Sequence, residues 1–230
     1  MLKSFTIAVL SVFLFLPLAG CDSYTKVFGI DLPRVVAGNG DVTVTQREVD
    51  SFTGVRVSGS YRVNLVPGGH GPVIVETDEN IQDHVITEVR DNTLYIRTRN
   101  ETSIRRYTEM NITVNAAVIE DLRTSGSSRI TFDGLHQNTL DVRTSGSSRI
   151  SGTGDVDELS IRSSGSSRID LAGLTALTAD VRSSGSSRIS VNASDLVQAR
   201  TSGSSRVEYT GDPARVDSRS SGSSRVRATR

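Results

Sequence analysis

The 230-residue chain has one cysteine, no tryptophan and no net charge. Its single cysteine excludes a disulfide framework within one chain. The formal net charge is zero, so the composition gives no indication of nucleic-acid binding. Tryptophan is absent, and hydrophobic residues make up only 36% of the chain. Such a composition suits a fold in which each unit buries only a thin inner row of side chains.

Residue patterns typical of metal sites or catalysis are also missing. The histidines His70, His84 and His136 stand far apart and lack ligand spacing, so we expect no metal and no cofactor. The Gly-Gly-x-Gly-x-Asp loops of calcium-binding solenoids do not occur. No cluster of carboxylates interrupts the regular part of the sequence, as the site of a polysaccharide-processing enzyme would. We therefore expect that the protein is not an enzyme.

What the sequence does contain is one phrase, φ-R-[TS]-S-G-S-S-R-[IV], that occurs six times, where φ is usually apolar. Its glycines follow one another at intervals of 18–20 residues. They are Gly126, Gly146, Gly165, Gly185, Gly203 and Gly222. A fixed period of this length indicates one structural unit per repeat, stacked on its neighbours. Glycine, serine and β-branched residues disfavour helix, so the sequence predicts an all-β, right-handed parallel β-helix-like solenoid with 18–20-residue coils.

The alternation within each repeat predicts which side chains face the core. Leu140 and Val142 are apolar, whereas Asp141 and Arg143 between and after them are charged. Successive side chains of a strand point to opposite faces, and an uncompensated buried charge is very costly, so the charged pair must point outward. The residue that follows the second arginine, such as Ile150, begins another inward row. The small Ser-Gly-Ser centre suits a bend where backbones approach closely.

Stacked repeats place the arginines in two columns, which hold 12 of the 24 arginines of the chain. The first arginine column is Arg123, Arg143, Arg162, Arg182, Arg200 and Arg219. The second arginine column is Arg129, Arg149, Arg168, Arg188, Arg206 and Arg225.

Only the first arginine column has regular acidic neighbours. Asp121, Asp141, Asp180 and Asp217 each precede one of its arginines by two residues and share the outer face. The second arginine column has only Asp170 and Glu208 close by. We therefore predict that the second arginine column is an anion-binding stripe, suited to a linear polyanion such as an acidic glycan. The alternative is a solvated stripe that keeps the solenoid soluble and prevents edge-to-edge aggregation.

The first residues have the features of a targeting segment. Lys3 supplies a positive charge, and the apolar run over residues 7–18 is too short to span a bilayer comfortably. The run ends in Leu-Ala-Gly-Cys, which resembles the lipobox of bacterial lipoproteins. That resemblance implies a signal peptide over residues 1–20, lipidation of Cys21, and an anchor in the membrane of the bacterial cell envelope. The alternative is a secretory signal with Cys21 as a free thiol. Asp22 favours the periplasmic face of the inner membrane, with the outer membrane as the alternative.

The remaining segments complete the domain organisation. Residues 21–40 have little periodicity and are expected to form a flexible tether. Residues 41–230 are expected to form the solenoid, with divergent coils over 41–120 and the regular repeats over 121–230. Residues 58–63, Ser-Gly-Ser-Tyr-Arg-Val, form a degenerate copy of the repeat phrase.

Several stretches resemble one bacterial family of unknown function. They are residues 40–44 (GDVTV), 47–59 (REVDSFTGVRVSG), 73–81 (VIVETDENI), 94–96 (LYI) and the Ser-Gly-Ser repeats. The family is described as putative auto-transporter adhesin, head GIN domain. The resemblance covers nearly the whole chain after residue 38 and implies a parallel β-helix-like solenoid, but no defined activity. Family repeats commonly run Ser-Gly-Ser-Gly-Asp, whereas Ser-Ser-Arg stands here, which exchanges an acidic column for a basic one.

Three functional classes follow from these observations. The first is a binding or adhesion module that presents its repetitive Ser/Arg surface to an acidic polysaccharide or an envelope protein. The second is a structural envelope lipoprotein without a small ligand. The third is an enzyme, which the regularity of the repeats disfavours.

Overall fold

The computed structural model describes residues 26–27, 30–31 and 33–229, and the chain divides into two compact units after Leu32. In the first unit, β1 (Lys26–Val27) pairs antiparallel with β2 (Ile30–Asp31). The predicted signal peptide over residues 1–20, the lipidated Cys21 and Asp22 lie outside the described residues. No helix of the described part is long and apolar enough to cross a membrane.

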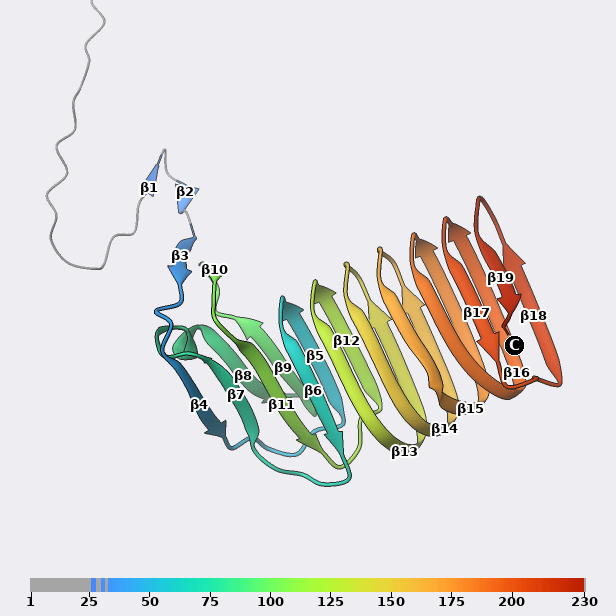
Figure 1. Ribbon diagram of the computed structural model, residues 1–230, viewed down its shortest axis with the longest axis horizontal. Helices are drawn as coiled ribbons and strands as arrows, with labels where there is room; N and C mark the ends of the chain where they lie inside the picture. The colour runs from blue at the N-terminus through green and yellow to red at the C-terminus, as the bar shows by residue number, and fades with distance from the viewer. Residues whose placement is uncertain (1–25, 28–29, 32, 230) are drawn as a thin grey trace, which may run out of the picture. The chain divides into compact units, whose positions relative to one another are not determined.

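The second unit is an all-β structure with about 70% of its residues in strands (Figure 1). Its first part contains β3 (Arg34–Ala37), β4 (Val42–Arg47), β5 (Gly54–Gly59), β6 (Arg62–Pro67), β7 (Val73–Asp78), the 3₁₀-helix η1 (Glu79–His84), β8 (Val85–Arg90), β9 (Thr93–Thr98), β10 (Thr102–Arg106) and β11 (Met110–Ala116). The repeats contain β12 (Asp121–Gly126), β13 (Arg129–Thr144), β14 (Arg149–Ser163), β15 (Arg168–Gly185), β16 (Arg188–Gly203), β17 (Arg206–Thr210), β18 (Arg215–Ser220) and β19 (Arg225–Ala228).

The repeats form a β-solenoid of about 5 turns with coils of ~20 residues. Neighbouring coils pair in parallel, and equivalent residues of the repeat stand opposite each other. Arg129 lies beside Arg149, and Arg143 beside Arg162, in the ladder between β13 and β14. The same register continues through β15, β16 and the last strands. The predicted one-repeat, one-coil architecture is therefore confirmed.

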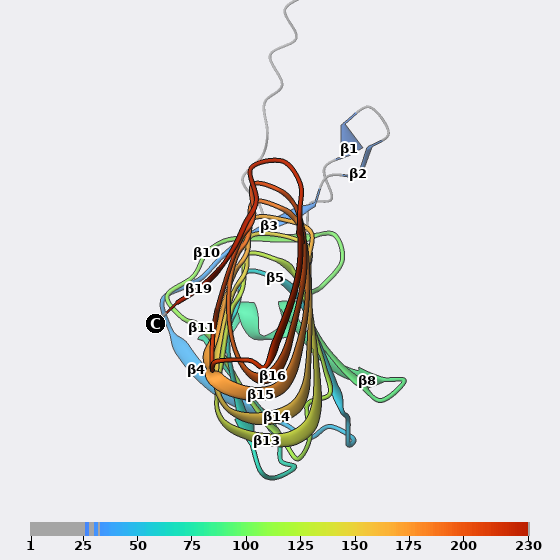
Figure 2. The ribbon, with the colours of Figure 1, turned by 90° about the vertical axis from the view of Figure 1, so that its right-hand side faces the viewer.

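Each coil has two long walls (Figure 2). The Ser-Gly-Ser phrase joins the walls at one end. At the other end the chain turns within a single long strand in β13, β14, β15 and β16, and the ladder of β13 with β14 shifts register there between Phe132 and Leu135. The wall that carries the first arginine column is formed by β12 and its equivalents, and the opposite wall is formed by the strands that begin with the second arginine column.

The core is a set of apolar rows between the two walls. Ile130, Ile150 and Ile169 are fully buried, as are Val142 and Ile161 from the facing wall. These are the inward positions that the alternation predicted. Each such side chain contributes roughly 1.5–3 kcal/mol when it leaves water, so the thin core gains stability by repetition.

The Ser-Gly-Ser end of each coil is held by buried hydroxyls rather than by apolar contacts. The Thr144 hydroxyl donates to Ser163 at 2.8 Å, and Ser163 and Ser187 lie 2.6 Å apart. Ser187 in turn donates to the carbonyl oxygen of Gly165 at 3.1 Å. Because the Ser187 proton is used there, Ser163 must be the donor to Ser187. This chain of hydrogen bonds links three successive coils.

The degenerate copy at residues 58–63 is confirmed as a coil in register with the first regular repeat. Gly59 lies beside Gly126, and Arg62 beside Arg129. The chain then continues beyond this coil in the opposite direction along the solenoid. Strands β9 and β11 pair in parallel with β5 and β6, respectively.

The outermost strands at this end differ from the expected divergent coils, because they pair antiparallel. Strand β8 pairs with β9, β7 with β11, and β4 with β7. Such an arrangement ends the parallel ladder at this end of the solenoid.

The structure also differs from the expected tether over residues 34–40. Strand β3 pairs in parallel with β10, and Val36 is buried. The buried carboxylate of Asp78 accepts hydrogen bonds from the N–H of Gly40 at 2.8 Å and from the N–H of Thr108 at 2.7 Å. This segment therefore belongs to the folded unit.

Candidate functional site

The two predicted arginine columns exist, and each is longer than the repeats alone indicate. Arg56 lies beside Arg123 and extends the first arginine column. Arg62 lies beside Arg129 and extends the second arginine column. The sequence reasoning missed both residues as members. The signal was present, because the degenerate copy at residues 58–63 contains Arg62, and Arg56 stands at the position of the first arginine.

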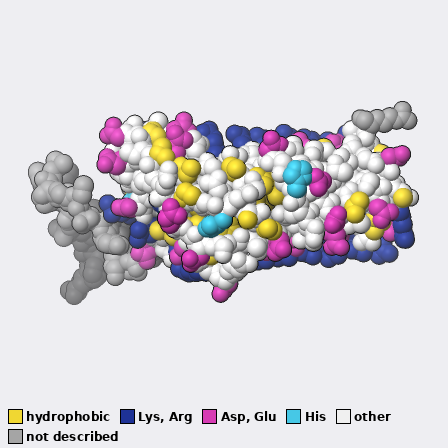
Figure 3. Space-filling model, turned by 90° about the horizontal axis from the view of Figure 1, so that it is seen from below, with side chains coloured by type: hydrophobic (Ala, Val, Ile, Leu, Met, Phe, Trp, Pro, Cys, Tyr) yellow, Lys and Arg dark blue, Asp and Glu magenta, His cyan; other side chains and the backbone are white. Residues whose placement is uncertain are grey.

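The two columns lie on opposite walls of the solenoid. Figure 3 views the molecule from the curved end of the coils, and the basic side chains lie along both long edges. The surface between these edges carries scattered acidic, apolar and histidine side chains. The protein has no net charge, yet its surface carries two separate rows of basic side chains.

Acidic neighbours neutralise part of the first arginine column. Arg143 and Arg162 both bind Asp141, at 2.6 Å and 3.1 Å. Arg182 binds Asp180 at 2.8 Å. In this wall the carboxylates stand between arginines of the same or the next coil, so they reduce the repulsion along the column.

The ion pair of Arg123 also changes the pKa of this arginine. The hydrogen bond to Asp121 raises the pKa of the Arg123 guanidinium, more than burial lowers it. At the β18 end of the column the predicted pairing of Asp217 with Arg219 is wrong, because Asp217 binds Arg215 at 2.9 Å. The reason is that Arg215 also lies two residues from Asp217 on the same exposed face, and side-chain parity does not choose between them.

The second arginine column has no such partners. Within residues 33–229, none of its six predicted members forms an ion pair, and only the added Arg62 meets an acid, Glu109, at 3.3 Å. Glu208 lies near the column in sequence but binds Arg227 of the next coil. Asp170 is exposed and makes no ion pair within the same range.

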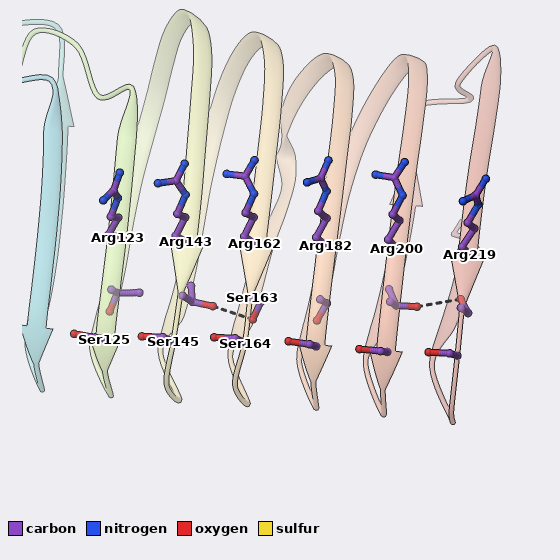
Figure 4. A pocket seen from close by; sticks show the side chains of 18 of the residues that line it. Arg123, Ser125, Arg143, Ser145, Arg162, Ser163, Ser164, Arg182, Arg200 and Arg219 are labelled. Atoms are coloured by element: carbon purple, nitrogen blue, oxygen red, sulfur yellow. Dashed lines mark hydrogen bonds between the residues drawn. The ribbon is translucent and has the colours of Figure 1, made fainter.

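Shallow hollows run beside both columns. A hollow of about 690 Å³ follows the first arginine column. Figure 4 shows its arginine side chains in one line and the hydroxyls of Ser125, Ser145 and Ser164 in a parallel line. Beside the second arginine column, two smaller hollows of about 410 Å³ and 360 Å³ are lined by arginines and the serines that precede them.

The described part of the chain holds no group of three or more His, Cys, Asp or Glu side chains placed to bind a metal ion. His136 contacts Asp155 at the exposed curved end of the coils, and His70 contacts the carbonyl oxygen of Val49. The chemistry that both walls offer is therefore hydrogen bonding and positive charge.

The fold and the repeats agree with a known family. The chain belongs to the family described as "Putative auto-transporter adhesin, head GIN domain", which matches residues 51–213. The family description makes the protein adhesin-like and indicates the cell surface or envelope. No curated protein matches the chain.

Solved structures share the same architecture. A putative adhesin from Bacteroides fragilis matches with a TM-score of 0.68 and 17% identity, over 84% of this chain and 100% of its own. A putative lipid binding protein from Parabacteroides distasonis matches with a TM-score of 0.57 and 21% identity, over 86% and 100%. A putative adhesin from the same species matches with a TM-score of 0.54 and 20% identity, over 85% and 100%. At these identities the likeness defines the fold.

Proposed function

We propose that this protein is a lipid-anchored binding module of the bacterial cell envelope, and that its second arginine column binds an extended polyanion such as an acidic polysaccharide. The observation that carries the proposal is the run of six arginines in consecutive register without an acidic partner in the described part of the chain. The adhesin-like family supports the same class of function.

The electrostatics of the column support a linear ligand. Like charges on neighbouring strands, ~4.8 Å apart, repel by roughly 1 kcal/mol per pair even in water. A polyanion that lies along the column offsets this repulsion at several coils at once. Guanidinium groups also bind carboxylates and sulfates in a bidentate manner, which favours ordered contacts over diffuse attraction.

The anchor is proposed from the lipobox that ends at Cys21. Lipidation there would hold the module at the membrane, and Asp22 favours the periplasmic face of the inner membrane over the outer membrane. Mass spectrometry of the mature N-terminus tests this part independently of any ligand. We expect an acylated Cys21 and fractionation with membranes, and a mature N-terminus elsewhere with an unmodified Cys21 would overturn it.

The binding proposal is tested by titrating the described domain, from residue 33 onward, with an acidic polysaccharide such as polygalacturonate at two salt concentrations. The test variant changes Arg149, Arg168 and Arg188 to Gln. The matched control changes three exposed arginines at the other end of the unit, Arg34, Arg105 and Arg106, to Gln. Both variants remove the same charge, but only the first one interrupts the second arginine column.

We expect the wild type and the control to bind at low salt and to lose affinity as salt rises, because exposed charges are screened. We expect the column variant to bind at least about tenfold more weakly. Equal binding by all three proteins, or no binding by the wild type at low salt, would favour the solvated stripe of a structural envelope lipoprotein.

A further inference from the structure

The first arginine column borders a groove whose chemistry differs from that of the second. Its floor is the backbone of the residues after each arginine, such as Thr144 and Ser163, whose hydroxyls point inward and are buried. One side is the line of arginine side chains, and the other is a line of outward serines (Figure 4). The serine line consists of Ser125, Ser145, Ser164, Ser184, Ser202 and Ser221.

The serine line offers unused hydrogen-bonding groups. Ser125 donates to the hydroxyl of Ser58 at 3.0 Å. The next five members are exposed, and within the described residues their hydroxyls bond to no protein group. Each hydroxyl can donate one hydrogen bond and accept two, so the groove presents one donor and acceptor per coil along its length.

On the arginine side, aspartates offset most of the positive charge in the middle of the groove. Arg143, Arg162 and Arg182 are held by aspartates, yet their side chains remain 39%, 43% and 48% exposed. A guanidinium has five N–H donors, and these ion pairs use only some of them. The remaining donors are held in place before a ligand arrives, which reduces the entropy lost on binding. Three guanidiniums share two carboxylates there, so most of their charge is offset while fixed N–H donors remain for the hydroxyl groups of a ligand.

The end of the groove near β18 is different, because charge accumulates there. Arg200 has Gln198 at the position where four of the other repeats carry aspartate. Arg219 is left without an acid because Asp217 binds Arg215. Among the described residues neither Arg200 nor Arg219 forms an ion pair, and both are exposed.

We infer that this groove is a second binding site, which holds an extended glycan of 1,4-linked hexoses with a carboxylate at the end that reaches Arg200 and Arg219. Successive coils repeat at ~4.8 Å, about the length of one hexose in such a chain. Each sugar therefore meets one serine hydroxyl and one guanidinium. This site is on the opposite wall from the second arginine column and does not depend on it.

Two oligosaccharides test the inference by calorimetric titration: cellohexaose, which is neutral, and its aldonic acid form, which carries one terminal carboxylate. We expect the acid to bind about tenfold more tightly than the neutral chain, because a charge-assisted contact forms at one end. Changing Arg200 and Arg219 together to Gln should remove this difference.

A second variant fills the groove. Changing Ser164 and Ser184 to Leu at these outward positions should weaken both oligosaccharides at least about tenfold, while thermal unfolding followed by circular dichroism stays close to that of the wild type. The variant with Arg149, Arg168 and Arg188 changed to Gln should bind both oligosaccharides as the wild type does. The inference is overturned if the wild type binds neither oligosaccharide at millimolar concentration. It is also overturned if the Leu variant binds as well as the wild type, or if the second-column variant loses this binding.

Discussion

A Cβ atom at Gly146 would lie 2.4 Å from the carbonyl oxygen of Gly126 in the neighbouring coil. The same oxygen accepts the backbone hydrogen bond from Ser147 at 2.8 Å. The two backbones therefore cannot separate to admit a side chain without losing the ladder at the Ser-Gly-Ser end. Gly165 repeats the relationship with Gly146, at 2.3 Å. The recurring glycine of the sequence is thus required by contact between coils.

Replacing Gly146 by Ala should destabilise the solenoid by about 1–3 kcal/mol, because the added methyl group has no space. The free energy of unfolding in urea measures the effect. Ser147→Ala is the matched control, since its side chain is exposed and its substitution should cost under about 0.5 kcal/mol. If the two variants unfold alike, close approach at the glycine does not limit the fold.

The buried hydroxyl chain makes a second prediction. Ser163 accepts a hydrogen bond from Thr144 and donates one to Ser187, all within the closed end of the coils. Ser163→Ala should cost about 1–3 kcal/mol, because both neighbours lose a buried partner. Its sequence neighbour Ser164 is exposed, so Ser164→Ala should change the free energy of unfolding by less than about 0.5 kcal/mol. A comparable loss in both variants would contradict the role of the internal chain.

Much of the repeat region follows from the sequence for simple physical reasons. The period sets which residues stack, because a shift of one residue would turn Ile150 outward and Arg149 into the core. The same parity placed both arginine columns on the surface and identified Asp141 and Asp180 as partners of the first column.

The parts that escaped prediction lack that constraint. No repeat links β8 to β9 or β4 to β7, so their antiparallel pairing had no signal in the spacing. Strand β3, which contains Val36, is only four residues long and its apolar residues do not alternate with polar ones, so the sequence pattern did not predict it. Its position depends on pairing with β10, far along the chain. Asp217 has an arginine two residues away on each side, so the sequence does not determine which one it binds. The side-chain conformations in the structure pair it with Arg215.

The buried carboxylate of Asp78 predicts a dependence of stability on pH. Burial alone would raise the pKa of Asp78, but hydrogen bonds from Thr108 and Gly40 outweigh burial and hold its pKa below the usual range. The folded pKa is therefore below the unfolded value of about 3.9, so the stabilisation is present above that value and is lost as the pH falls through the folded pKa.

Thermal unfolding from about pH 7 to about pH 2 should therefore show a falling Tm in the wild type. Asp78→Asn should unfold at a lower temperature at neutral pH and lose less on acidification, because the group that titrates is gone. Asp83→Asn, at an exposed position of η1, serves as the control. An identical pH profile for the wild type and Asp78→Asn would show that this carboxylate does not link stability to pH.

Removing the shared carboxylate of Asp141 would increase the positive charge of the wall that carries the first arginine column. This carboxylate holds Arg143 and Arg162 because the coil of Arg162 carries Ser160 at the aspartate position. Asp141→Asn frees both guanidiniums, so the first arginine column should gain affinity for polygalacturonate at low salt, by roughly threefold or more, with a steeper loss as salt rises. Stability should change by less than about 1 kcal/mol, since the ion pairs are partly exposed. Asp157→Asn makes the same charge change at an exposed site outside both columns and should leave binding unchanged. If it raises affinity as much as Asp141→Asn, net charge alone governs binding, and the placement of acids along the first column has no role in it.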